Sequence, residues 1–230
     1  MRLRIKRHKQ KTERTFRIRS FYNTRIAISC SEGLSIFPTA TFYPSLTMKY
    51  TRIKNTKHPL FTKVWSLYKK SFPPEERRQL RAQIKIMDNP LYHFEIIVND
   101  DEFIGFIMWW SFEKIRYIEH LATLPRLRGK GYGQHILKRF TSESTPILLE
   151  VEHPDTEINK RRICFYQRMG FIINEYEYKQ PPHKKHGNYV PLILMTYPNT
   201  IPKEDIRFFC QQYSEHASAY NYMPVVHADY

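Results

Sequence analysis

The chain has 230 residues, enough for one domain of ordinary size with appended segments. Its 41% hydrophobic content can fill a core, and no apolar run approaches the roughly 18 residues of a membrane span, so no membrane segment is expected. The three cysteines lie far apart in no metal-ligand spacing, so no metal site is expected either.

The formal net charge of +15 is unevenly distributed. Residues 1–47 hold ten Lys/Arg against two Asp/Glu, whereas residues 58–230 hold 23 against 20. A nearly balanced body limits nucleic-acid binding to a weak activity of the basic arm. We interpret residues 1–47 as a disordered extension, or as a leader upstream of a working start at Met48, and expect a cytoplasmic protein.

A folded domain is predicted over residues 48–197, followed by a C-terminal helix and tail over 198–230. Its first half begins with an extended segment at Met48 and a helix over 58–71, which Phe72-Pro73-Pro74 ends. A second helix should run from Pro74 to about Met87. Three strands follow, over 93–98, 103–112 and 117–124, and Asn99-Asp100-Asp101 forms the turn between the first two.

The second half alternates between helices and strands. The expected order is a helix over 130–141, a strand over 147–151, a helix over 158–169, strands over 171–178 and 190–197, and a short helix over 204–213. This alternation predicts an α/β fold in which a parallel strand pair belongs to a mixed sheet with helices packed on it.

Three of the chain's seven glycines, Gly129, Gly131 and Gly133, fall between a predicted strand and a predicted helix. Backbone N–H groups without side chains at a helix N-terminus form a cavity for phosphate, and Arg128 and Lys130 add positive charge. The spacing fits neither the dinucleotide fingerprint nor the P-loop, because Gln134 and His135 follow the last glycine.

The segment from Leu121 to Gly133, LATLPRLRGKGYG, resembles the acetyl-CoA signature of the GNAT superfamily of N-acetyltransferases. A second block matches independently: Asn159, followed by Phe165-Tyr166 and the turn Gly170-Phe171. The resemblance covers about residues 48–197. It implies the GNAT fold, a mixed and mostly antiparallel sheet with a splayed parallel strand pair and flanking helices. It also implies direct transfer of acetyl from acetyl-CoA to a primary amine.

The resemblance further implies which residues bind acetyl-CoA. The strand end contacts pantetheine, the loop amides hold the diphosphate, and one asparagine and one tyrosine complete the site: Leu121, Ala122, Thr123, Arg128, Gly129, Lys130, Gly131, Tyr132, Gly133, Asn159 and Tyr166. Thr123 stands where the family usually has Val. Tyr166 is the expected general acid, because the family places this hydroxyl near the CoA sulfur.

For the general base, the resemblance favours Glu119, while His120 has the better intrinsic pKa. Water, or the protonation equilibrium of the substrate itself, is the third alternative. Strand alternation places these two side chains on opposite faces, so only one of them should face the site. Glu150 and Glu152 share a face. They either attract a cationic amine or are simply solvated or paired with Arg161 and Arg162.

The acceptor amine is not indicated by the sequence, and either a monomer or a homodimer is compatible with it. An alternative interpretation is a non-catalytic acetyl-CoA-binding regulatory module, which would keep the glycine loop without a working acid and base.

Overall fold

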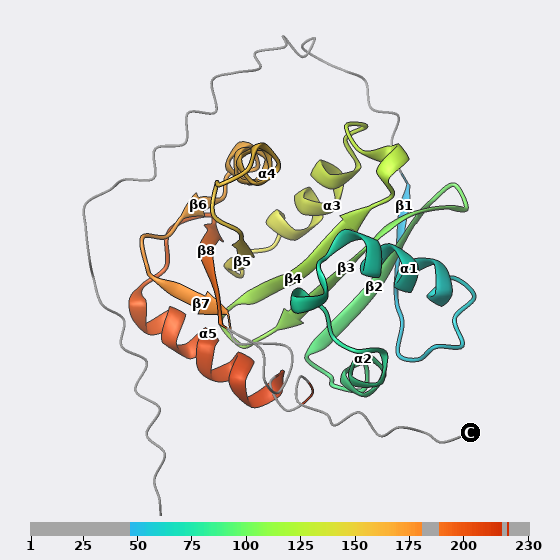
Figure 1. The fold of residues 1–230 in the computed structure, drawn as a ribbon, viewed down its shortest axis with the longest axis horizontal. Helices are drawn as coiled ribbons and strands as arrows, with labels where there is room; N and C mark the ends of the chain where they lie inside the picture. Colours follow the sequence, from blue (N-terminus) through green and yellow to red (C-terminus); the bar gives the residue numbers. More distant parts are fainter. Residues whose placement is uncertain (1–46, 181–188, 218–219, 221–230) are drawn as a thin grey trace, which may run out of the picture.

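The structure, a computed structural model, describes residues 47–180, 189–217 and 220. The described strands form an eight-stranded sheet in the order β1-β2-β3-β4-β5-β8-β6, with β7 paired to β8 beside this path. Helices cover both faces of the sheet (Figure 1). The strands are β1 (Met48–Arg52), β2 (Tyr92–Asn99), β3 (Glu102–Ser111), β4 (Arg116–Thr123), β5 (Ile147–Val151), β6 (Ile172–Ile173), β7 (Tyr178–Gln180) and β8 (Val190–Tyr197). The helices are α1 (Phe61–Ser71), η1 (Pro74–Glu76), α2 (Leu80–Ile86), η2 (Pro125–Leu127), α3 (Tyr132–Thr141), α4 (Glu157–Arg168) and α5 (Lys203–His216).

The strand pairing confirms the predicted mixed sheet. All neighbouring strands are antiparallel except β4 and β5, which are parallel. The β2–β3 turn lies at Asp100 and Asp101, whose φ angles of 46° and 63° are left-handed, as a two-residue hairpin turn requires. Almost all of the predicted extension, residues 1–46, lies outside the described residues.

Two apolar clusters fill the two faces of the sheet. On one face, Val64 of α1 and Phe209 of α5 pack with Phe106 of β3. On the other, Ile136 of α3 and Ile163 of α4 pack with core residues that include Ile107, Ile118 and Leu149. The C-terminal helix, predicted over 204–213, therefore contributes to the core of the domain.

The predicted second helix is wrong as a continuous element. The chain forms η1, then extended backbone at Arg77 (φ −113°, ψ 139°) and Gln79 (φ −67°, ψ 152°), and only then α2. Between them Arg78 is buried, with 2% of its surface exposed, and its side chain pairs with Glu119. The interruption lets this side chain reach the core beside β4.

The single strand predicted over 171–178 is also wrong, because β6 and β7 are separate. Their registers against β8 differ by two residues, since Ile172 faces Thr196 whereas Tyr178 faces Leu192. Asn174 is buried in the interruption, donates a hydrogen bond to Thr196 Oγ1 (2.8 Å) and accepts one from Ile201 N (3.2 Å). The Asn174 side-chain amide thus holds the segment around Ile201, which follows β8, in place.

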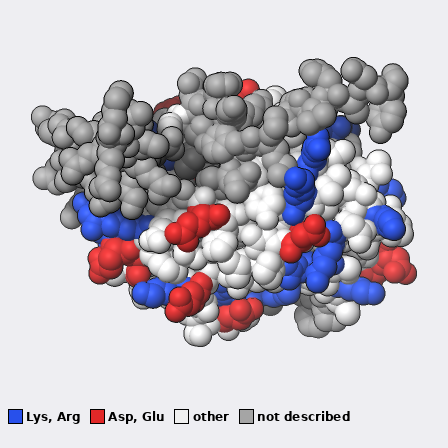
Figure 2. Space-filling view, turned by 90° about the horizontal axis from the view of Figure 1, so that it is seen from below, with Lys and Arg blue, Asp and Glu red and all other residues white. Residues whose placement is uncertain are grey.

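Charged side chains of both signs lie next to one another on the face drawn in Figure 2. That view shows no continuous basic surface among the described residues. No helix in the described part of the chain combines the length and the apolar run needed to cross a bilayer.

Candidate active site

The parallel strands β4 and β5 part after a short stretch of pairing. Arg116–Ile118 pairs with Ile147–Leu149, and the rest of each strand continues without the other (Figure 1). Leu121, Ala122 and Thr123, the predicted pantetheine contacts, lie beyond this point and pair with β3 on their other side. Their second edge is therefore not bonded to β5. We call the place where the two strands part the splay point.

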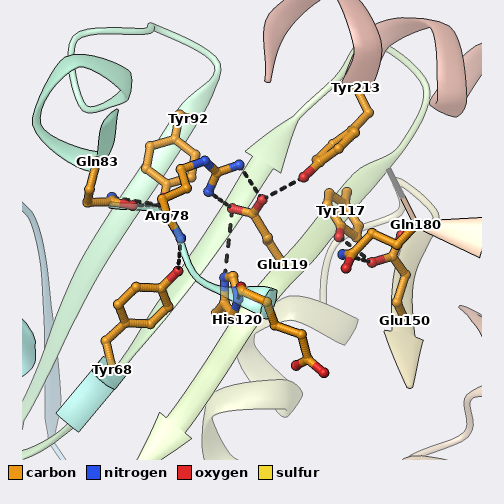
Figure 3. Close-up of polar contacts among 11 residues, drawn as sticks. Tyr68, Arg78, Gln83, Tyr92, Tyr117, Glu119, His120, Glu150, Gln180 and Tyr213 are labelled. Carbon is orange, nitrogen blue, oxygen red and sulfur yellow. Dashed lines mark hydrogen bonds and ion pairs between the residues drawn. The ribbon is translucent and has the colours of Figure 1, made fainter. Parts of the chain in front are cut away.

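A β-bulge interrupts β4 at the splay point. Met108 of β3 faces His120, and Trp109 faces Ile118, so Glu119 is the extra residue. The alternation predicted from the sequence is therefore wrong here. Glu119 and His120 lie on the same side of the sheet, where His120 Nδ1 is 3.9 Å from Glu119 Oε2 (Figure 3).

The side chain of Glu119 is completely buried in a bidentate ion pair. Arg78 Nη1 donates to Oε2 at 2.6 Å, Arg78 Nη2 donates to Oε1, and the Tyr213 hydroxyl from α5 donates to Oε1 at 3.2 Å (Figure 3). Charge-assisted bonds of this kind stabilise the anion. Both carboxylate oxygens of Glu119 therefore already accept hydrogen bonds from other side chains.

His120 is packed between aromatic rings, with centroids 5.0 Å from Tyr68 and 4.4 Å from Phe72. Burial lowers its pKa to about 4, and Arg78 lowers it further, whereas Glu119 and the bond to Glu76 oppose the shift. The imidazole is therefore neutral at pH 7. Its Nε2 lies 3.0 Å from the Glu76 carbonyl oxygen, and because a carbonyl only accepts, Nε2 carries the proton. His120 thus anchors η1 to β4.

The sequence places Glu150 and Glu152 on the same face of a strand, but in the structure their carboxylates have different partners. Tyr117 and Gln180 donate to Glu150 Oε2 at 2.8 and 2.5 Å (Figure 3). Burial raises the pKa of Glu150 to about 7, hydrogen bonds from neighbouring side chains oppose this rise, and Glu119 adds to it. Glu152 instead pairs with Arg162 of α4, one of the two alternatives that the sequence left open.

The glycine loop between η2 and α3 has the backbone that its sequence predicts. Gly129 and Gly131 adopt left-handed φ angles of 75° and 83°, which side chains disfavour. Gly131 is the N-cap of α3, and the first helical bond joins His135 N to Gly131 O at 3.1 Å. The amides of the first turn have no partner within the helix, which is the arrangement that binds anions at helix N-termini.

The loop also meets the second sequence block. A Cβ atom on Gly133 would lie 3.3 Å from Phe165 Cζ, so the start of α3 packs directly against α4. Phe165 precedes Tyr166, and the two motifs that the sequence separates by about 30 residues are neighbours in the fold.

Exposed positive charge accompanies the loop. Arg128 and Lys130 are both exposed, and Arg128 lines a surface cavity of about 700 Å³ between α1 and the segment after β4. Lys63, Lys70 and Arg126 line the same cavity, and Arg126 forms an ion pair with Glu102. None of the carboxylates near the splay point lines it. The cavity is therefore a neighbour of the loop and not part of the carboxylate side of the site.

On α4, Asn159 and Tyr166 lie seven residues apart, about two helical turns, and hence on one face. Asn159 Nδ2 donates to His153 O at 2.9 Å, which fixes the connection from β5. Burial raises the pKa of Tyr166 to about 12, which Arg162 opposes and Glu152 reinforces. The phenol therefore keeps its proton at neutral pH.

Sequence reasoning missed Arg78, Tyr213 and Gln180. Arg78 follows Glu75-Glu76-Arg77, a run of charges that looks like a solvated helix face. Tyr213 and Gln180 come from elements whose position relative to β4 depends on the completed fold. Among the described residues, no group of three or more His, Cys, Asp or Glu side chains could hold a metal ion.

Comparisons with known proteins agree with this architecture. A family model described as an acetyltransferase (GNAT) domain matches residues 90–173. A solved structure from Bacteroides thetaiotaomicron, assigned to the GNAT acetyltransferases, is 38% identical with a TM-score of 0.67, and the match covers 72% of this chain and 96% of that one. An acetyltransferase from Thermus thermophilus shares the fold at 18% identity and a TM-score of 0.50, over 67% of this chain and 98% of that one. The comparison with curated proteins gave no match.

Proposed function

Since this chain belongs to the GNAT acetyltransferase family, we propose that it transfers the acetyl group of acetyl-CoA to a primary amine. One observation carries the proposal: the left-handed glycine loop caps α3, and the start of α3 packs on α4 at Phe165, the residue before Tyr166. This contact brings an anion-binding backbone and a protonated phenol to the same helix pair.

In this proposal the amides and side chains from Arg128 to Gly133 hold the diphosphate of acetyl-CoA. Unbonded helix amides favour an anion, and the exposed Arg128 and Lys130 add charge without blocking the approach. Leu121, Ala122 and Thr123 present a strand edge that is not bonded to β5, which suits the amides of pantetheine. Asn159, whose Nδ2 is already engaged, would contribute its carbonyl oxygen.

Tyr166 is the proposed general acid. Its raised pKa means that the phenol is protonated at neutral pH and has a proton to give to the thiolate as that group departs. The amine attacks the thioester directly, so no nucleophilic side chain is needed.

We propose a structural and electrostatic role for Glu119 in place of the expected role as base. Its two oxygens are occupied by Arg78 and Tyr213, so the anion holds together the segment before α2, the bulge of β4 and α5.

The proposal is tested by measuring two quantities on the same protein. Calorimetry reports the affinity for acetyl-CoA, and a thiol reagent reports CoA release in the presence of a panel of small amines, amino acids, aminoglycosides and peptide N-termini. An amine-dependent release of thiol is expected. Tight binding without amine-dependent release would instead support the non-catalytic acetyl-CoA-binding module, and absence of binding would contradict both functions.

A further inference from the structure

We propose that Glu76 is the catalytic base that takes a proton from the acceptor amine, and that the acceptor is an amine carrying positive charge at neutral pH. This inference rests on the function proposed above.

The position of Glu76 is fixed by hydrogen bonds to its own backbone and to the backbone of Arg78, two residues further along the chain. His120 Nε2 donates to the Glu76 carbonyl oxygen at 3.0 Å, and Arg78 N donates to the Tyr68 hydroxyl at 3.0 Å. Glu76 N also donates to Pro73 O at 3.1 Å, which closes η1. The short helix is therefore held to β4 at the bulge and to α1, so the backbone that carries the Glu76 carboxylate lies beside the splay point.

The Glu76 carboxyl lies within electrostatic reach of two residues, one just after β5 and one on α4. Glu152 and Arg162, which pair with each other, both act electrostatically on Glu76. The same two residues act on Tyr166, one turn of α4 beyond Arg162. Glu76 and the proposed acid Tyr166 therefore both lie within electrostatic reach of Arg162, on the same side of α4 as the splay point's second strand, β5.

The other carboxylates near the splay point are already engaged. Glu119 is bonded to Arg78, Glu152 is paired with Arg162, and Glu150 accepts from Tyr117 and Gln180. In the described part of the chain, the Glu76 carboxylate has neither a hydrogen bond nor an ion pair of its own. Because its side chain is only partly buried, an incoming ammonium group can reach it.

The charges around Glu76 tune it for this task. Burial raises its pKa to about 7, Glu152 and Glu75 add to the rise, and Arg162 opposes it. His120, whose ring bonds to the Glu76 carbonyl oxygen, is neutral at this pH. A base whose pKa is close to the working pH is present as the anion in a substantial fraction and still binds the proton strongly enough.

The proposed reaction releases one proton to solvent in each turnover. The ammonium transfers one proton to Glu76, so an N–H bond breaks and an O–H bond forms, and this proton later passes to water. The amine lone pair then forms the C–N bond as the C–S bond breaks, and the thiolate takes the proton of Tyr166. The nitrogen loses its second proton to the phenolate through water, which restores Tyr166.

The test compares Glu76→Gln with Glu75→Gln, a matched change at the exposed neighbour on the same short helix. With an amine substrate of the wild-type enzyme, kcat should fall on the order of 100-fold in Glu76→Gln and change little in Glu75→Gln. The wild-type kcat/KM should rise with pH through about 7, and this rise should be absent in Glu76→Gln. Affinity for acetyl-CoA, measured by calorimetry, should be the same in all three proteins.

The outcomes separate this role from the proposed function. A Glu76→Gln enzyme that keeps wild-type kcat and the same pH dependence overturns the role of Glu76 alone. Equal losses of acetyl-CoA affinity and kcat would show a structural role and overturn it as well. Glu76→Asp keeps the carboxylate and should recover part of kcat. A wild-type protein that binds acetyl-CoA but acetylates no amine overturns the proposed function. The role of Glu76 as catalytic base is then overturned as well.

Discussion

The two sides of the splay point are built from different kinds of groups. The glycine loop offers backbone amides at a helix N-terminus, on a surface where Arg128 and Lys130 are exposed. The opposite side, between η1, β4 and α5, is built from buried side-chain charges, with Glu119 and Arg78 completely enclosed. The loop therefore depends on local backbone conformation, whereas the carboxylate side depends on charges that the fold brings together.

This difference predicts different responses to mutation. A change in the loop should affect ligand binding more than folding, because few core contacts are lost. A change among the buried charges should affect folding first, because an unpaired charge in the core is costly. The following variants test whether the two sides separate in this way.

The largest effect on stability is expected for Arg78→Met. It leaves the Glu119 carboxylate buried without its cation, and breaking a buried pair typically costs about 3–5 kcal/mol in the free energy of unfolding. Urea unfolding measures the loss. A double variant, Arg78→Met with Glu119→Leu, removes both charges and should recover part of it. If the double variant is no more stable than the single one, the pair is not the source of the effect.

The next effect belongs to the loop. Gly131→Val places a branched side chain at a left-handed φ of 83° and in front of the helix amides, so affinity for acetyl-CoA should fall about 100-fold or more. Gly131→Ala, a smaller change, should lose less. Calorimetry gives the affinities, and a thermal unfolding midpoint close to wild type shows that the fold is retained. Unchanged affinity in a folded Gly131→Val protein would remove the loop from the binding site.

The same contrast explains how much could be predicted from sequence. The helix predicted over 58–71, which runs over Phe61–Ser71, the hairpin turn at Asp100-Asp101 and the glycine loop were predictable because each depends on residues within one short segment. The pairing of Glu119 with Arg78 and Tyr213 was not, because these partners lie 41 and 94 positions away from it along the chain. The bulge at Glu119 was hidden for the same reason, since it appears only in the register of β4 against β3.

Tyr166→Phe should lower catalysis while sparing both folding and cofactor binding. The ring keeps its packing and only the hydroxyl is lost, so kcat and kcat/KM should fall together, on the order of 100-fold. Tyr189→Phe, which removes a hydroxyl from an exposed tyrosine just before β8, serves as the control and should keep kcat near wild type. Wild-type turnover in Tyr166→Phe would exclude this phenol as the proton source.

The smallest effect is a pH dependence of stability that arises at Glu150. Its pKa is raised from an ordinary 4.5 to about 7, chiefly by burial, so the folded protein holds this proton more tightly than the unfolded chain. The resulting stabilisation is complete below about pH 4.5 and is lost as the pH rises through 7. Wild-type protein should therefore lose free energy of unfolding between about pH 5 and 8 relative to Glu150→Gln, whose amide cannot ionise, by about 1 kcal/mol or more.

Urea unfolding at several pH values measures that difference. Glu76, the other carboxyl with a pKa near 7, is present in both proteins and cancels in the comparison. Glu177→Gln, at an exposed position just before β7, should follow the wild-type curve. Parallel curves for wild type and Glu150→Gln would mean that the hydrogen bonds from Tyr117 and Gln180 fully compensate for the burial of the carboxylate. Ionisation of Glu150 would then cost no free energy of unfolding. Of the buried carboxylates discussed, only Glu119 would still differ from the glycine loop by affecting folding first.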